Sequence, residues 1–457
     1  MKITLISPAM GRIKEGFVDS WKMEPLSMAV LAGITPDKHE VSFYDDRVER
    51  LDYDKPADLV AIAVETYTAR RAYQIAYHYR LRGAKVVMGG FHATLMPEEA
   101  QAHADAVVVG EAEPIWSELL QDAEAGKLKP LYRGESRPCL GNLKLDRSIF
   151  KGKNYVPLTL VETGRGCNFA CDFCAVTAYY ERSYRYRPPA HVAAEIAEGG
   201  RKRVFLVDDN LSANPDRLKT LLREIAPLNV RWMSQATIKT ADDPEVVKLL
   251  QKSGCEAILI GFESLGEATL KSMKKGFNRG QPNYTDNLKR LRDAGIKVYA
   301  TFVFGYDTDT PDVFERTLDF AMQQRFFVAA FNHLQPFPGT PLYKRMEEAG
   351  RMLYPKWWLQ PGYNFGEICF QPTTMSPGEL YERLAETRRT FYSKRSIALR
   401  SLDFKANFNS AHGAWTHLWV NSILRRELNQ KWKTPLGDLS EAFWPETPET
   451  LGKAVAA

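Results

Sequence analysis

The sequence contains 457 residues, of which 44% are hydrophobic and 26% are charged, with a formal net charge of +5 at pH 7. This composition is typical of a globular chain of two or three domains, and the mild charge gives no reason to expect a nucleic-acid partner. No apolar run reaches 18 residues, and the first residues look like a strand rather than a signal peptide, so neither a membrane span nor secretion is expected. Six cysteines, three of them clustered, favour a reducing cytoplasmic compartment.

Residues 1–127 alternate short β-branched segments with amphipathic segments, which predicts a buried parallel sheet whose connections are helices. Strands are expected at 2–7, 41–45, 59–64, 85–88 and 106–109, and helices at 25–33, 69–82, 97–104 and 114–125. Such units predict a doubly wound, flavodoxin-like (Rossmann-like) α/β domain, in which ligands bind beyond the carboxyl ends of the strands. The residues that follow the third and fourth strands include Thr66, Tyr67, Thr68, Gly89, Gly90 and His92.

Two successive glycines, Gly89 and Gly90, allow a flat ligand to approach the backbone closely. They can equally form a tight turn, with His92 as a helix cap or a solvated loop residue. Residues 128–155 are rich in proline, glycine and charge, and they are expected to form a linker.

Strand–helix units recur in residues 156–345, with chemistry expected at the carboxyl ends of the strands. Six strands are expected at 158–162, 204–207, 230–234, 257–261, 298–304 and 327–331. Helices are expected between them at 191–198, 215–225, 244–253, 284–294 and 312–323.

Three cysteines, Cys167, Cys171 and Cys174, form a C-x3-C-x2-C motif with Phe173 directly before the third. Three thiolates at this spacing can hold three irons of a [4Fe–4S] cluster and leave the fourth iron open. A structural zinc site usually has four ligands in paired short spacings, and no second pair lies nearby in the sequence. The alternatives are a zinc site or a set of reduced core cysteines, since an odd trio cannot pair off into disulfides.

This motif resembles the cluster-binding loop of the radical S-adenosylmethionine (SAM) enzymes, which read C-x3-C-x-aromatic-C. The resemblance implies that the three cysteines bind the cluster and that Phe173 packs near the adenine of SAM. It also implies that SAM binds the open iron and is cleaved to a 5′-deoxyadenosyl radical. The six β/α units match the open (β/α)6 barrel of this family rather than a closed eightfold barrel.

The same resemblance gives functions to polar residues at the ends of the expected barrel strands. The candidate SAM contacts are Asp208, Asp209, Gln235, Glu263 and Ser264, the last two within a G-x-E-S pattern. The candidates for substrate contact or proton handling are Tyr306, Asp307 and His333. Each of them can instead be a solvated strand end or a helix cap, and a lone histidine is more often structural.

The strand-end sequences of residues 1–127 resemble the cobalamin-binding domain that precedes the barrel in the B12-dependent branch of the family. On this resemblance Thr66, Tyr67, Thr68, Gly89, Gly90 and His92 line the nucleotide tail of cobalamin. The loop at 8–12 lacks the Asp-x-His-x-x-Gly motif, so a protein histidine at cobalt is not expected. A B12-like fold that has lost its cofactor is the alternative.

The resemblance fades beyond residue 345, and residues 346–457 are expected to form a mostly helical extension. Residues 414–433 are apolar and basic, and a packed domain helix is favoured there over a helix that lies on a membrane.

Together these features predict a cobalamin-dependent radical SAM enzyme that methylates an unactivated carbon of a small molecule, with electrons from a flavodoxin- or ferredoxin-type donor. One alternative is a radical SAM enzyme that catalyses cyclisation, rearrangement or transfer of another SAM-derived group. The other is a non-catalytic cobalamin or iron–sulfur sensor.

Overall fold

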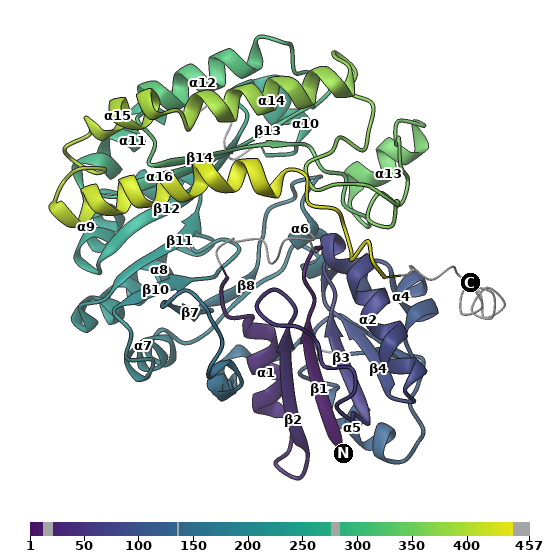
Figure 1. Cartoon of the computed structure of the whole chain (residues 1–457). Coiled ribbons are helices and arrows are strands. Elements are labelled where there is room, and N and C mark those ends of the chain that lie inside the picture. Colours follow the sequence, from purple (N-terminus) through teal and green to yellow (C-terminus); the bar gives the residue numbers. More distant parts are fainter. Residues whose placement is uncertain (12–21, 135–136, 276–283, 442–457) are drawn as a thin grey trace. The chain divides into compact units, whose positions relative to one another are not determined.

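The computed structural model describes residues 1–11, 22–134, 137–275 and 284–441 (Figure 1). The chain forms two compact units. The first comprises Met1–Val156, Tyr354–Glu367 and the residues from Gln430 onward, and the second comprises Pro157–Leu353 and Ile368–Asn429. The chain therefore returns twice to its first unit after the barrel. Arg12 of the expected histidine-free loop, and the expected extension beyond residue 441, lie outside the described residues.

The first unit is built on a six-stranded parallel sheet with the order β2-β1-β3-β4-β5-β6. The strands are β1 Lys2–Ser7, β2 Glu40–Asp45, β3 Leu59–Ala63, β4 Lys85–Gly89, β5 Ala106–Val109 and β6 Leu131–Arg133. The first five have the flavodoxin-like order, so the predicted fold of this unit is confirmed. The sixth strand lies in the segment expected to be a linker and pairs with β5.

Helices connect the strands of this sheet because its residues are apolar on both faces and need cover on both sides. The helices are α1 Leu26–Ile34, α2 Ala69–Leu81, α3 Phe91–Leu95, α4 Pro97–His103 and α5 Trp116–Glu124, and short 3-10 turns occupy Thr66–Thr68, Leu140–Asn142 and Arg147–Phe150. Ile3, Leu5, Leu59 and Trp116 form part of one buried core.

The second unit contains a six-stranded parallel sheet with the order β14-β13-β12-β11-β10-β7. The strands are β7 Thr159–Val161, β10 Arg203–Leu206, β11 Arg231–Ala236, β12 Cys255–Glu263, β13 Lys297–Phe304 and β14 Val328–His333. Their helices are α7 Pro189–Glu198, α8 Pro215–Ile225, α9 Pro244–Lys252, α10 Glu267–Ser272, α11 Tyr284–Asp293 and α12 Val313–Gln323. The predicted partial (β/α)6 barrel is confirmed.

Three short elements surround the cysteine motif. An antiparallel pair, β8 Gly164–Gly166 and β9 Tyr184–Tyr186, lies on either side of it in the sequence, and α6 Ala175–Tyr180 follows the third cysteine.

The segment after the barrel is helical, as expected, with α13 Pro341–Glu348, α14 Pro377–Phe391, α15 Lys394–Ser401 and α16 Ala411–Lys431. Helices α14 and α16 lie along the edge strand β14 in Figure 1. Arg388 on α14 donates to the carbonyl oxygen of Phe331 at 2.7 Å, and Asn421 on α16 donates to that of Phe327 at 3.1 Å. These two side chains thus provide hydrogen bonds to backbone carbonyl groups at and beside β14, the edge strand of the sheet.

Helix α16 packs through His417 and Asn421, which are buried, while Trp415, Leu418 and Trp419 are exposed. Among the described residues, no helix is long and apolar enough to cross a membrane. The domain boundaries expected at residues 127, 155 and 345 remain predictions.

Candidate active site

The cysteine motif forms a loop between β8 and α6. Gly166, which enters the loop, has φ of +84°, and a Cβ there would lie 2.2 Å from the carbonyl oxygen of Ser183. Only glycine fits such a backbone. The loop turns tightly on itself, since the amide of Cys174 donates to the carbonyl oxygen of Cys171 at 3.3 Å.

The three thiols lie in a largely buried environment: Cys171 is buried, and Cys167 and Cys174 are half-buried. Burial raises the pKa of Cys171 to about 12, against the opposing charge of Lys275. Burial also raises the pKa of Cys167, although the Asn210 amide, 3.8 Å from its sulfur, opposes the shift. Bound iron would supply the positive charge that such thiols need to ionise, so this soft donor set fits a [4Fe–4S] cluster.

Among the described residues, no three His, Cys, Asp or Glu side chains converge closely enough to bind a single metal ion. A cubane cluster takes one thiolate at each of three irons, so its ligands need not converge on one point.

The residues after β10 hold the cysteine loop from one side. Both oxygens of Asp208, which is fully buried, accept from Thr163, from its amide at 2.7 Å and its hydroxyl at 2.5 Å. Burial raises the pKa of Asp208 to about 6, against these hydrogen bonds. Asp209 accepts from the amide of Gly166 at 2.8 Å. The carboxylates therefore fix the backbone on the N-terminal side of the motif.

The end of β12 carries a strained backbone and a buried ion pair. Glu263 has φ of +61°, which is uncommon for a residue other than glycine. Its carboxylate lies 2.6 Å from the ammonium of Lys275; the side chain of Lys275 is 8% exposed and that of Glu263 is 11% exposed. Ser264, also buried, accepts from the amide of Gly266 at 3.1 Å and so shapes the following turn.

No local pattern in the sequence distinguishes Lys275 as a site residue. It is one of two adjacent lysines after α10, and only the tertiary structure shows that Lys275 is buried while Lys274 is exposed. Gln235, which was expected at this end of the barrel, is half-buried on β11, and its carbonyl oxygen accepts from the amide of Leu211.

The three candidates at strands β13 and β14 lie in different settings. Tyr306 is buried, and its hydroxyl donates to Asp172 at 3.0 Å. Asp307 is exposed and pairs with Arg351 at 2.7 Å. His333 is buried, which lowers its pKa to about 4 although Gln335, at 2.7 Å, opposes the shift. His333 is therefore neutral at pH 7. Phe173 packs edge-on against Tyr306, with ring centroids 6.4 Å apart.

In the first unit, the candidate cofactor residues lie at the carboxyl ends of β3 and β4, which are hydrogen-bonded neighbours. Gly90 has φ of +98°, and a Cβ there would lie 2.9 Å from the carbonyl oxygen of Val64, so this turn requires glycine. A Cβ on Gly89 would only contact Val108 at 3.6 Å, and one on Gly110, just after β5, would meet nothing within 4 Å. This edge leaves room for a ligand against the backbone, and it fits a flat cofactor.

His92 lies below this edge and is fully buried. Its Nδ1 lies 3.3 Å from the Thr66 hydroxyl, and its Nε2 lies 3.1 Å from Glu99. Burial would raise the pKa of Glu99, but His92, Trp358 and Lys356 outweigh it and hold that pKa at about 2. The histidine therefore supports Thr66 from within the protein.

Tyr67 and Thr68 occupy the turn after β3. The Tyr67 ring packs against Trp357 and Phe365, with centroids 5.0 and 5.1 Å away, so the returning segment Tyr354–Glu367 adds aromatic cover to this end of the unit. The Thr68 hydroxyl accepts from the amide of Glu65 at 3.0 Å and caps the turn.

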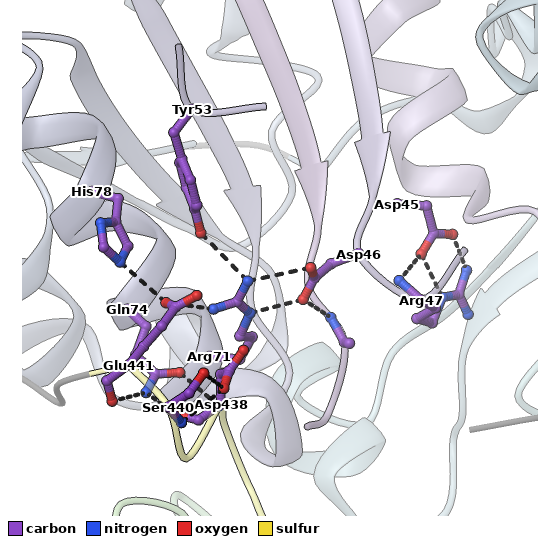
Figure 2. Close-up of polar contacts among 11 residues, drawn as sticks. Asp45, Asp46, Arg47, Tyr53, Arg71, Gln74, His78, Asp438, Ser440 and Glu441 are labelled. Atoms are coloured by element: carbon purple, nitrogen blue, oxygen red, sulfur yellow. Dashed lines mark hydrogen bonds and ion pairs between the residues drawn. The ribbon is translucent and has the colours of Figure 1, made fainter. Parts of the chain in front are cut away.

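The C-terminal segment is held on the same unit by a buried arginine (Figure 2). Arg71 on α2 donates to Asp46 at 2.8 and 3.3 Å, and it pairs with Glu441 at 2.6 Å. The amide of Gly437 donates to the carbonyl oxygen of Met10 at 2.9 Å. The segment thereby anchors the start of the loop that follows β1.

The chain combines an open parallel barrel, which carries three clustered cysteines, with a flavodoxin-like unit. This combination is typical of an iron–sulfur enzyme that also binds a cofactor with a nucleotide tail. The models of two families match: the Radical SAM superfamily over residues 161–321, and the B12 binding domain over residues 21–120. The chain is 33% identical over 389 residues to bacteriochlorophyllide d C-12(1)-methyltransferase of Chlorobaculum tepidum, which covers 82% of this chain and 84% of the relative.

The chain is also 29% identical to bacteriochlorophyllide d C-8(2)-methyltransferase of Chlorobaculum tepidum, over 82% of this chain and 87% of the relative. Its fold is similar to that of the radical SAM methyltransferase TsrM of Kitasatospora setae, with a TM-score of 0.67 and 18% identity over the whole of both chains. It is also similar to that of the cobalamin-dependent radical SAM enzyme OxsB, with a TM-score of 0.62 and 15% identity over 94% of this chain and 72% of that one. The chain belongs to the cobalamin-dependent radical SAM methyltransferases, whose cofactors are a [4Fe–4S] cluster, SAM and cobalamin.

Proposed function

We propose that this enzyme methylates an unactivated carbon of a tetrapyrrole, a planar conjugated macrocycle. The observation that carries this proposal is the 33% identity to a bacteriochlorophyllide methyltransferase, which extends over both units of the chain. When bound, the cluster supplies the electron that cleaves SAM, and cobalamin carries the methyl group. We further propose that the electrons come from a flavodoxin- or ferredoxin-type donor in a reducing cytoplasm.

Cys167, Cys171 and Cys174 are the proposed cluster ligands. Asp208 and Asp209 are proposed to orient the cysteine loop, because their oxygens accept hydrogen bonds from the backbone that enters it.

The proposed site for the amino-acid end of SAM is the Glu263–Lys275 pair. SAM carries an ammonium and a carboxylate side by side, and a buried carboxylate beside a buried ammonium offers the complementary charges. The carbonyl oxygen of Met273, two residues before Lys275, accepts from the amide of Asp172 in the cysteine loop at 3.2 Å, which supports a position of the pair near the cluster. Gln235, Ser264 and Phe173 complete the proposed SAM contacts, with Phe173 near the adenine.

For the substrate, Asp307 is the best placed of the three candidates, since it is exposed and its partner Arg351 adds a positive charge for an acidic substituent. Tyr306 and His333 are buried and hydrogen-bonded, and they support the barrel mouth from within.

In the first unit, Thr66, Tyr67, Thr68, Gly89 and Gly90 are proposed to line the cobalamin tail, with His92 acting through Thr66.

The test is anaerobic purification with hydroxocobalamin supplied, followed by iron and cobalt counts and a reaction with SAM, a reductant and a bacteriochlorophyllide. About four irons and one cobalt per chain, with a product heavier by one methyl group, are the expected results. Replacement of Cys167, Cys171 or Cys174 by alanine should abolish 5′-deoxyadenosine formation, whereas Cys139→Ala, at an exposed free cysteine, should not. Cleavage of SAM with any other mass change would overturn methyl transfer, and cobalt-free enzyme that still methylates would overturn the role of cobalamin.

A further inference from the structure

The cysteine loop contains an acidic side chain that the proposed chemistry does not use. Asp172 lies between Cys171 and Phe173, and its side chain is completely buried. The Tyr306 hydroxyl donates to one carboxylate oxygen at 3.0 Å, and the Arg345 guanidinium donates to the other at 2.9 Å. A buried carboxylate persists only when it is paired and hydrogen-bonded, and this one is both.

The backbone of Asp172 is held as well. Its amide donates to the carbonyl oxygen of Met273 at 3.2 Å, and its carbonyl oxygen accepts from the amide of Leu342 at 3.0 Å. Four hydrogen bonds therefore attach one residue of the loop to the turn after β13, to the residue after α10 and to α13.

We propose that Asp172, Tyr306 and Arg345 form a positioning clamp that fixes the cysteine loop and sets the charge beside its iron–sulfur cluster. The clamp rests on the proposed function only in requiring that the three cysteines bind a cluster. The proposal makes Tyr306, a candidate from the sequence for substrate contact or proton handling, a positioning residue instead.

The electrostatic argument follows from the position of the carboxylate. Reduction adds a negative charge to the cluster, and a carboxylate on the residue next to a ligand opposes that charge. Arg345 offsets the carboxylate, although its side chain is 44% exposed and its effect is partly screened by water. Removing the carboxylate should make the cluster easier to reduce, and removing the arginine should make it harder to reduce.

The experiment is a redox titration of the reconstituted full-length protein without substrate, followed by electron paramagnetic resonance. We expect Asp172→Asn to raise the midpoint potential and Arg345→Gln to lower it, with a change of up to tenfold in the reduction equilibrium, or about 59 mV for one electron. Tyr306→Phe should lower the potential by less and alter the resonance signal, since the charge stays and one hydrogen bond is lost.

Lys344→Gln is the matched control: it removes a cation from the same helix, where Lys344 pairs with Glu348 on the exposed surface at 3.8 Å. It should leave the potential unchanged. Opposite shifts for Asp172→Asn and Arg345→Gln cannot arise from a general loosening of the fold. Shifts of the same sign, or unchanged potentials with four irons retained, would overturn the clamp.

If Asp172→Asn loses its cluster, the comparison of Arg345→Gln with Lys344→Gln still decides the matter. Methyl transfer is not measured, so the clamp can fail while the proposed function stands. A wild-type protein that binds no iron would refute the proposed function itself.

Discussion

Arg71 should contribute more to the stability of the first unit than any surface ion pair. The variant Arg71→Met keeps most of the apolar stem but leaves Asp46 fully buried without its cation, and it removes the pair with Glu441 (Figure 2). Breaking a buried pair from one side typically costs about 3–5 kcal/mol, because the remaining charge is uncompensated. At about 1.4 kcal/mol per factor of ten, local opening should become roughly a hundred- to several-thousand-fold more frequent.

Native-state hydrogen exchange of the full chain measures this effect, through peptides of β1, β2 and α2. Arg82→Met is the control at the end of the same helix: its pair with Asp54, at 3.5 Å, has side chains that are 43% and 93% exposed. An exposed pair contributes at most about 1 kcal/mol. The double variant Arg71→Met with Asp46→Asn should regain part of the loss, since it no longer buries an unpaired charge. Equal protection in Arg71→Met and Arg82→Met would refute the reasoning.

Three further predictions concern the two sites. The pKa of Glu99 is depressed from 4.5 to about 2 in the folded state, so its contribution to stability is complete above pH 4.5 and is lost as pH falls toward 2. Acid titration of the thermal midpoint should therefore show a loss over that window that is smaller in Glu99→Gln, where carboxylates such as Glu441 still titrate, and an identical profile would contradict this. Gly90→Ala should destabilise the first unit by about 1–3 kcal/mol in urea unfolding, because the φ of Gly90 is positive and a Cβ there would clash with the backbone. Gly89→Ala should cost little stability, and it should weaken cobalamin binding if the cofactor lies against this edge. Lys275→Met should weaken SAM binding at least tenfold in equilibrium dialysis, whereas the neighbouring Lys274→Met should not, and equal affinities would exclude Lys275 as a SAM contact.

Local patterns predicted most of the elements. The strands at 2–7 and 106–109 and the helix at 215–225 begin and end where they were expected, because apolar periodicity and flanking turn residues are local signals. The strand β6 was missed, since its three residues are too few to show a period. The antiparallel pair of β8 and β9 was missed for the same reason, because each strand has only three residues.

The candidate site could be predicted from the sequence only in part. The cysteines were singled out because their spacing alone indicates a thiolate trio, and their assignment as cluster ligands stays a prediction. Asp208 was expected to face SAM, but its oxygens are occupied by Thr163, which lies 45 residues away in the sequence. Hydrogen bonds over such separations leave no trace in a local pattern.

Alternation and spacing act over a few residues at a time, so they were enough to predict the two parallel sheets and the thiolate trio, and the resemblance of the cysteine motif indicated the family. Packing of the whole chain sets which polar side chains are exposed and which are buried in hydrogen bonds or ion pairs. It buried Lys275 rather than Lys274, paired Asp172 with Tyr306 and Arg345, and returned the C-terminal segment to Arg71. These choices depend on burial and on partners far away in the sequence, and burial is a property of the packed chain rather than of any segment.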